Sequence, residues 1–254
     1  MRTAPFLVAD VTAELQDAVD TAAAPVAPSD PVPVYATHLP ASASLHYVAQ
    51  RGASSGSAQL QWRRDGAEYE LTLDSALPGQ PLLGSTSRGR VDADGVAPVR
   101  HVERRKLRDV RATNFQRDTG FISFSGPSQI VPLHAGAQDR LSWMIQLPAI
   151  IEADPALGDI GARITLFVVG TRGDAEAWVF QARGRQSIEL PAGTLHDALH
   201  FVREPTRPFD THIEIWLDPA RQHLPVRARF ATVPGGQALE LLLAHAGDPG
   251  AGLN

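Results

Sequence analysis

The chain has 254 residues, of which 43% are hydrophobic and 20% charged, with a formal net charge of −5 and no cysteine. This length suffices for one large β domain or two smaller units with buried cores. The acidic balance disfavours a nucleic-acid-binding protein, which normally carries a clustered positive excess. The lack of cysteine excludes disulfides, thiolate nucleophiles and Cys-ligated zinc.

The first segment, residues 4–24, is predicted to form a short amphipathic helix. Four apolar residues recur at every fourth position and build one stripe: Leu7, Val11, Leu15 and Val19. No stretch of about 18 apolar residues is present, so we expect no transmembrane helix. The apolar run that begins at Phe6 ends at Asp10, too early for a signal peptide. If the protein is exported, its targeting segment is expected to be absent from this chain.

A proline-rich segment follows at residues 24–33. Proline fixes φ, removes a backbone donor and restricts the residue before it, so this segment is expected to be an extended, semi-rigid spacer. The hydrophobic pattern changes shortly afterwards. We therefore predict three parts: the N-terminal helix and spacer over 1–43, a single β-rich domain over 44–246, and a flexible tail over 247–254.

The β-rich part begins at Leu45, where apolar residues start to alternate with polar ones, as in half-buried strands. Asp65 and Gly66 lie between two such runs and predict a hairpin with a type I′ turn. Further strands are predicted over 82–92, 99–107, 110–115, 120–124 and 129–133.

One segment interrupts the strands. Residues 137–147 are predicted to form a helix that can continue past Pro148, and Asp139 near its start suits a capping role. Strands are then expected over 162–169, 175–182, 186–190, 194–202, 211–217, 225–231 and 238–244. Helical crossovers between successive strands are missing, which argues against a parallel α/β fold. We expect a mainly β protein with a large curved antiparallel sheet around one central helix, and barrel, half-barrel and sandwich all fit these strands.

Four pieces of the sequence carry a resemblance to a known family. They are the opening hairpin over 45–69, the basic strand Arg100–Lys106, the run Gln138–Ser142, and Ile215–Asp218 followed by Leu224–Arg227. In this order they resemble an uncharacterised, mainly proteobacterial envelope family, domain of unknown function 3108. The resemblance covers about residues 45–243.

The resemblance implies a place in the periplasm or cell envelope, often behind a hydrophobic anchor and a proline-rich spacer. The spacer is present here and the anchor is not. Such families look similar to the open, curved sheets of periplasmic lipoprotein carriers, in which a concave apolar face shelters acyl chains. Fold-level analogy is a weak basis for function. The family has no established catalytic residues, so none is carried over.

Two motifs were weighed as reactive sites and set aside. His196 and His200, with His212 as a third member, could hold a metal ion, but the surrounding run alternates like a polar strand face and lacks a metalloprotease glutamate. The serines between Gly52 and Gly56 lack the Gly-x-Ser-x-Gly spacing of a nucleophile elbow. We therefore predict no catalytic residue, no metal site and no cofactor.

Trp62 and Trp216 are the candidates for the lining of an apolar ligand cavity. Arg100, Arg104 and Lys106 are the candidates for a basic rim that meets a charged headgroup. The predicted function is a non-catalytic envelope domain that binds a lipid or another hydrophobic small molecule. The alternative is a structural or interaction module that contacts another envelope protein or the cell wall. An enzyme acting on an envelope polymer comes last, because no acid–base pair stands out.

Overall fold

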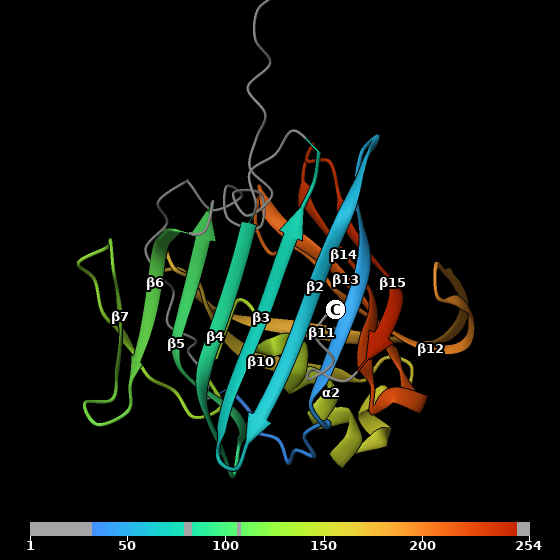
Figure 1. The fold of residues 1–254 in the computed structure, drawn as a ribbon. Coiled ribbons are helices and arrows are strands. Elements are labelled where there is room, and N and C mark those ends of the chain that lie inside the picture. Colours follow the sequence, from blue (N-terminus) through green and yellow to red (C-terminus); the bar gives the residue numbers. More distant parts are fainter. Residues whose placement is uncertain (1–31, 79–82, 106–107, 248–254) are drawn as a thin grey trace, which may run out of the picture.

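Fifteen strands form one curved sheet in residues 32–78, 83–105 and 108–247, the parts of the chain that the computed structural model describes (Figure 1). The first half contributes β1 (Ala43–Arg51), β2 (Ser54–Asp65), β3 (Glu68–Ala76), β4 (Leu83–Asp92), β5 (Gly95–Arg105), β6 (Arg108–Gln116), β7 (Phe121–Phe124) and β8 (Val131–Pro132). The second half contributes β9 (Gln138–Asp139), β10 (Arg163–Val169), β11 (Ala175–Leu190), β12 (Gly193–Arg203), β13 (Asp210–Asp218), β14 (Leu224–Val233) and β15 (Leu239–Gly247). The predicted mainly β fold is confirmed.

The sheet consists of two meanders that meet in its middle. One runs from β1 to β8 and the other from β9 to β15, and the pairing of β1 with β15 joins them. The described neighbours pair antiparallel except β9 and β10, which are parallel. The predicted antiparallel sheet is therefore mixed at one edge, where a helical crossover supplies the long connection that parallel strands require.

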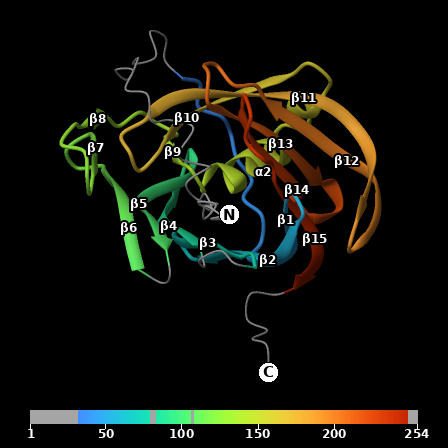
Figure 2. The same ribbon diagram turned by 90° about the horizontal axis from the view of Figure 1, so that it is seen from above.

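That crossover contains the helix α2 (Trp143–Ala153), which lies inside the curve of the sheet (Figure 2). Its residues from Trp143 to Ile151 are all buried. An apolar helix that is buried on every side needs a surrounding core, and the inward-facing residues of both meanders provide it.

The sheet does not close into a barrel by backbone pairing. Side chains near its two edges bridge the gap instead: Thr113 of β6 donates to the Gly170 carbonyl (3.1 Å), and Gln129 donates to the Gly173 carbonyl (2.8 Å). A second apolar cluster fills the same seam, and it contains Phe115, Ile122, Val131, Ala137, Phe167, Val169 and Ala175. The result is an open sheet with a barrel-like shape.

The helix begins later than the sequence pattern predicted. We expected it over about 137–147, and it spans Trp143–Ala153, with the predicted continuation past Pro148. Gln138 and Asp139, near the start of the expected helix, form β9 instead. Pairing with the buried strand β10 overrides their local helical pattern.

Asp139 nevertheless has the predicted capping role, but for the turn ahead of the helix. Its carboxylate accepts hydrogen bonds from the backbone N–H groups of Leu141 (2.8 Å) and Ser142 (2.7 Å). The Ser142 hydroxyl in turn accepts from the Asp139 N–H (2.9 Å). These bonds satisfy donors that a buried helix start would otherwise leave without partners.

Two glutamines tie the helix segment to the start of β5. Gln146 accepts from the Val96 N–H (2.8 Å) and donates to the Asp94 carbonyl (2.7 Å), while Gln138 donates to the Val96 carbonyl (2.8 Å). Gly95 beside them has a φ of +101°, and a Cβ there would lie 2.5 Å from the Gln146 side-chain oxygen. Only glycine therefore fits at this close approach.

The predicted hairpin between β2 and β3 is present with a different turn. Asp65 pairs with Glu68, so the central residues are Gly66 and Ala67 rather than Asp65 and Gly66. Gly66 has a φ of +55° and Ala67 is not among the described residues with positive φ. Glycine at the first central position is typical of a type II′ turn, which also matches the twist of the flanking strands.

Two predicted strands, 175–182 and 186–190, are one continuous strand, β11, with 16 residues. The pattern suggested a break because the alternation changes near Gly184. Its φ is +92°, and the register with β12 shifts between Ala182 and Gly184. An irregularity of this kind inserts a residue and bends a strand without ending it.

The segment ahead of the sheet contacts the domain from Tyr35 onward. The Tyr35 hydroxyl accepts from the Thr165 N–H (3.0 Å), and the His38 N–H donates to the Ala149 carbonyl of α2 (2.8 Å). The predicted helix over 4–24, the first part of the spacer and residues 248–254 of the predicted tail lie outside the described residues. Among the helices of the described part, none is long and apolar enough to cross a membrane.

We expect Ile150→Ala to reduce the free energy of unfolding by about 2–5 kcal/mol, because it leaves a cavity beneath a helix that the sheet surrounds. Ile150 is 0% exposed. The matched control is Ile160→Ala, whose side chain is 81% exposed and should change stability by less than about 0.5 kcal/mol. Urea titration measures both, and equal losses would contradict the central role of α2.

Candidate functional site

A cavity of about 50 Å³ lies inside the sheet at the N-terminal end of α2. Its apolar lining comes from α2 and from strands of both meanders: Leu73, Leu141, Trp143, Met144, Trp178, Ile213 and Phe230. Its polar lining consists of Ser85, His101, Glu103, Arg140 and Thr211. An apolar cavity with a few convergent polar groups is the usual form of a small-molecule site.

His101 of β5 is the most deeply buried polar residue of this lining. Its Nε2 lies 2.8 Å from the Ser85 hydroxyl, and its Nδ1 has no hydrogen-bond partner among the described residues. In a serine hydrolase, a third group bonded to Nδ1 orients the histidine. The Ser85–His101 pair lacks that group, so its geometry does not support nucleophilic catalysis.

Glu103 lies two residues further along β5 and is 5% exposed. Burial raises the pKa of its carboxyl group, although the neighbouring His101 and Arg111 oppose this rise. Desolvation favours the neutral form of a buried acid. Glu103 therefore brings to the cavity wall a carboxyl group that is less acidic than an exposed glutamate.

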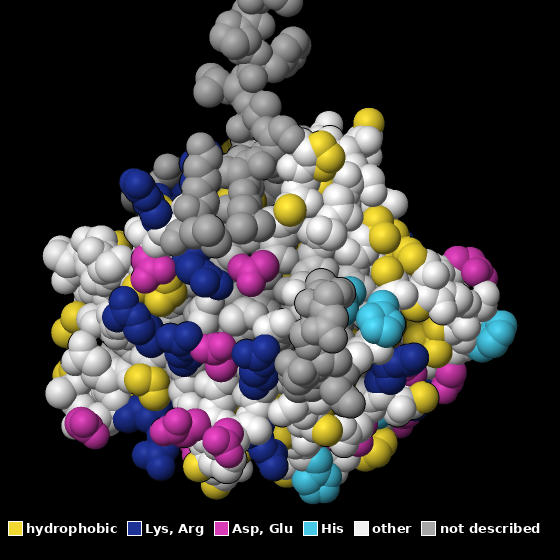
Figure 3. Space-filling view, in the orientation of Figure 1, with side chains coloured by type: hydrophobic (Ala, Val, Ile, Leu, Met, Phe, Trp, Pro, Cys, Tyr) yellow, Lys and Arg dark blue, Asp and Glu magenta, His cyan; other side chains and the backbone are white. Residues whose placement is uncertain are grey.

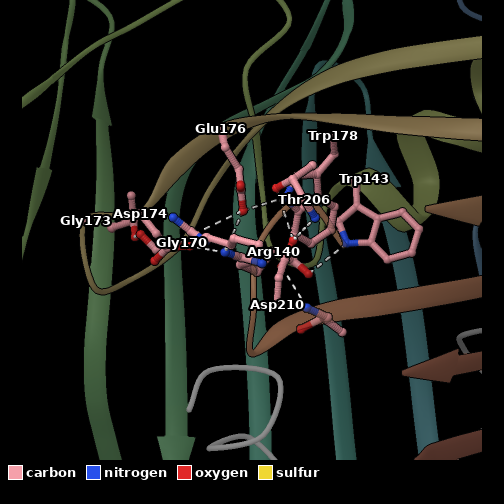
Figure 4. Close-up of polar contacts among 12 residues, drawn as sticks. Arg140, Trp143, Gly170, Gly173, Asp174, Glu176, Trp178, Thr206 and Asp210 are labelled. Atoms are coloured by element: carbon pink, nitrogen blue, oxygen red, sulfur yellow. Dashed lines mark hydrogen bonds and ion pairs between the residues drawn. The ribbon is translucent and has the colours of Figure 1, made fainter. Parts of the chain in front are cut away.

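Arg140, shortly ahead of α2, belongs to the polar lining of the cavity, and Figure 4 shows its contacts. It is paired with Asp174 and lies 3.7 Å from Glu176, and its guanidinium stacks 4.6 Å from the ring centre of Trp178. Burial alone would raise the pKa of Asp174, but the charge and hydrogen bond of Arg140 hold it below its ordinary value. The charge of Arg140 is thus already neutralised within the protein.

A second buried arginine extends this arrangement. Arg203 is 1% exposed, donates to both oxygens of Asp210 (3.1 and 2.8 Å), and lies 4.4 Å from the ring centre of Trp178. Glu176 approaches both Arg203 (3.5 Å) and Arg207 (3.7 Å). We call Arg140, Arg203, Arg207, Asp174, Glu176, Asp210 and Trp178 the arginine network. It fixes the loops after β10 and β12 to the start of α2.

A buried chain of hydrogen bonds attaches the start of α2 to the opposite wall. The Tyr69 hydroxyl lies 2.7 Å from the Ser87 hydroxyl, which donates to the Asp139 carboxylate at 2.5 Å. Burial, reinforced by the Asp139 charge, raises the pKa of Tyr69. The tyrosine therefore stays protonated and acts as a structural donor.

Residues 42–242 match the sequence family described as Protein of unknown function (DUF3108), over most of the described domain. The chain belongs to this family. The match confirms the resemblance identified from the sequence, and it assigns no activity.

Similarity to one solved structure supports the fold alone. No curated protein matches the chain. It is similar to the crystal structure of a β-barrel-like protein of the domain of unknown function DUF1849 from Brucella abortus, with a TM-score of 0.56 and 13% identity over 82% of this chain and 98% of that one. A match to the crystal structure of MucB has a TM-score of 0.31 and 14% identity, over 84% of this chain and 55% of that one.

In this family member, the two predicted cavity residues do not line the cavity described above. Trp62 is buried, donates to the Pro40 carbonyl (3.0 Å) and packs against Tyr69. Trp216 is stacked on His200, with ring centres 4.4 Å apart, and Arg227 lies over its ring. Trp143 and Trp178 occupy the positions beside the cavity instead.

The predicted basic rim lies on the outer face of β5. Arg100 donates to Asn114 (2.7 Å) and Arg104 pairs with Asp74 (3.3 Å), and neither residue lines the cavity. Lys106, the third member, lies outside the described residues.

The three histidines considered as metal ligands do not form a common site. His196 lies near Ser187, whereas His200 and His212 both approach Glu214 (3.3 and 3.6 Å). Across the described ranges, no group of three or more histidine, aspartate and glutamate side chains is arranged to hold a metal ion.

Sequence reasoning missed the residues that the structure brings together at α2. Arg140 and Asp174 are 34 positions apart and carry no shared motif. The sequence could have identified Glu103, because alternation along β5 places it on the same face as the buried His101 and opposite to Arg100 and Arg104. The basic character of that strand hid this difference.

Asp174→Asn is expected to lower the free energy of unfolding by about 3 kcal/mol at neutral pH, because it leaves the buried Arg140 poorly paired. Because the pKa of Asp174 is lower in the folded state than its ordinary value of 3.8, its ionised carboxylate stabilises the fold above pH 3.8. This stabilisation is lost as the pH falls through the folded-state pKa. The variant should therefore lose less stability than wild type on acidification. Urea titrations across acidic pH measure this. Asp197→Asn, which alters an exposed Asp–Arg pair, is the control and should cost less than about 1 kcal/mol.

Glu103→Gln should have the opposite effect and raise the free energy of unfolding at neutral pH, on the order of 1 kcal/mol. Because the pKa of Glu103 is higher in the folded state than its ordinary value of 4.5, its neutral carboxyl group gives its full stabilisation below pH 4.5. This stabilisation is lost as the pH rises through the folded-state pKa. Glutamine does not titrate, so the gain should grow as pH rises from acidic to neutral. Glu68→Gln, at an exposed site, should show no such trend. A gain independent of pH would refute this assignment.

Proposed function

We propose that this domain is a non-catalytic interaction module of the bacterial envelope, with a solid interior and a binding role for its outer surface. One observation carries the proposal: α2 fills the space inside the sheet, with every residue from Trp143 to Ile151 buried. The proline-rich segment ahead of the domain supports the envelope location, because such a spacer holds a rigid domain away from an attachment point.

The size of the cavity supports this proposal over a lipid carrier. Sites for drug-sized ligands usually measure about 300–1,000 Å³, whereas the cavity beside α2 measures about 50 Å³. An acyl chain would have to displace part of α2, whose glutamine and aspartate contacts hold it to both walls. Of the two binding functions considered from the sequence, the contact with another envelope protein or the cell wall is therefore favoured.

Binding of a lipid or another hydrophobic molecule inside the sheet is the second candidate. The observation in its favour is the cavity lining, in which Trp143, Met144 and Trp178 surround a space that also borders the unpartnered Nδ1 of His101. Methionine repacks easily around ligands. This candidate requires the cavity to enlarge on binding.

The polar groups of the interior support a non-catalytic role. The Ser85–His101 pair has no orienting partner at Nδ1. The guanidiniums of Arg140 and Arg203 are paired with Asp174 and Asp210. A reaction would need a free charged or basic group directed at a substrate, and these groups are committed to one another.

We expect organic extracts of the purified domain to contain no lipid in stoichiometric amount, because the interior has no room for an acyl chain. Denaturing mass spectrometry beside an unrelated protein of similar size tests this. A lipid enriched in stoichiometric amount would overturn the proposal in favour of the second candidate.

A variant with an enlarged cavity shows whether such an assay can detect interior binding. Met144→Ala should cost about 2–5 kcal/mol of stability and open a space that accepts a small aromatic molecule such as indole. Isothermal calorimetry should give heat of binding for this variant and none for wild type. Equal binding by both would mean that the native interior is already open.

A further inference from the structure

The outer face of strands β2 to β5 carries a shallow groove of about 560 Å³ that is lined mainly by charged residues. Figure 3 shows basic and acidic side chains interleaved on this side of the molecule. The lining contains five arginines (Arg63, Arg64, Arg88, Arg90 and Arg100) against three acids (Asp65, Glu68 and Glu70). The groove is therefore net positive, in a chain whose formal net charge is −5.

The sheet register arranges part of this charge in one row. Arg63, Glu70, Arg88 and Arg100 are successive cross-strand partners on β2, β3, β4 and β5. Neighbouring strands lie about 4.8 Å apart, so the row brings three arginines and one glutamate onto adjacent strands. Glu70 pairs with Arg88, and the arginine excess remains.

A bulge between β4 and β5 shapes the floor of the groove. The register shifts between Arg88 and Gly89, so that Arg88 pairs with Arg100 while Gly89 pairs with Pro98. A Cβ on Gly89 would lie 2.2 Å from the Ala97 carbonyl oxygen, which only glycine avoids. Val99 is the extra residue of the bulge and is 43% exposed beside Arg100. Bulges commonly redirect side chains in this way.

The arginines of β4 are available to a partner. The Arg88 side chain is 68% exposed although it contacts Glu70. Arg90 is exposed and has no hydrogen bond or ion pair within the described ranges. Guanidinium groups present a planar fork that suits carboxylates, and an exposed surface pair such as Arg88–Glu70 is readily exchanged for another.

We propose that this groove binds an acidic, extended peptide segment of a partner protein. The arginines would bind its carboxylates, Val99 would contact an apolar side chain, and Glu68 and Glu70 would accept from its N–H groups. A planar anionic membrane fits less well, because it would cover these acids together with the arginines. The inference rests on the proposed function and names the chemistry of the partner.

The test uses the full chain and a short fluorescent peptide in which glutamate alternates with valine, with fluorescence anisotropy as the readout. Wild type should bind this peptide, and binding should weaken as salt rises, because exposed charges are screened. A peptide with glutamine in place of glutamate should not bind. The double variant Arg88→Gln with Arg90→Gln should bind the acidic peptide about tenfold more weakly, which corresponds to about 1.4 kcal/mol.

Two control variants sharpen the result. Arg183→Gln with Arg185→Gln removes the same charge from two exposed arginines at the same spacing on β11, and it should leave peptide affinity within about twofold of wild type. Glu70→Gln should instead tighten binding severalfold, because it removes a repulsive charge and releases Arg88, while the amide oxygen of glutamine can still accept from a peptide N–H group.

Absence of peptide binding, or equal losses in the β4 and β11 variants, would overturn the inference. Binding to phosphatidylglycerol vesicles that is lost in the β4 variant, without binding to the peptide, would also overturn it and assign the groove to a membrane. A lipid in the organic extracts would instead overturn the proposed function, whatever the peptide result. The two failures are therefore distinguishable.

Discussion

The structure depends on the burial of the helix α2 inside a curved sheet whose two edges are not joined by backbone hydrogen bonds. Enclosing α2 removes the polar groups at its ends and along its approach from water, and each must find a partner within the protein. Asp139 supplies acceptors for the turn before the helix, and Gln138 and Gln146 bond both backbone groups of Val96. Helix and shell are thus specified together, because the same side chains satisfy both.

The arginine network also holds the start of α2, by attaching it to the loops after β10 and β12. It pairs Arg140 with Asp174 and Arg203 with Asp210, and both guanidiniums contact Trp178. Buried ion pairs often contribute little net stability, yet breaking one leaves an uncompensated charge. Their effect here is to fix the positions of two loops relative to the helix. The buried charges of the arginine network therefore have a structural role, whereas the exposed charges that a partner could contact lie on the outer face of the sheet.

The sequence predicted the features that depend on neighbours along the chain. The alternation from Leu45 and the Asp65–Gly66 pair predicted the first strands and their hairpin, and the apolar run around Ile145 predicted the central helix α2. It did not predict β9, because Gln138 and Asp139 have no strand pattern of their own and pair only through β10. Nor did it predict the contact between Arg140 and Asp174, which depends on the pairing of β9 with β10, two strands that are far apart in the sequence. Arg100 and Arg104 were predicted as the rim of a cavity and lie on the outer face of β5, and Trp62 and Trp216 were predicted as its lining and pack elsewhere, because the residue types alone do not locate a cavity.

The pairing of β1 with β15 has a consequence for how the protein folds. These strands come from the two ends of the domain, so the ladder in the centre of the sheet forms only after nearly the whole chain is available. Contacts of such large sequence separation slow folding, because the entropy of loop closure is lost before they form. During synthesis, the first meander has an unpaired edge at β1 and an apolar face without its helix until the later strands emerge. This half-built state would expose the unpaired strand edge and the apolar face, and both promote aggregation until the last strand is in place.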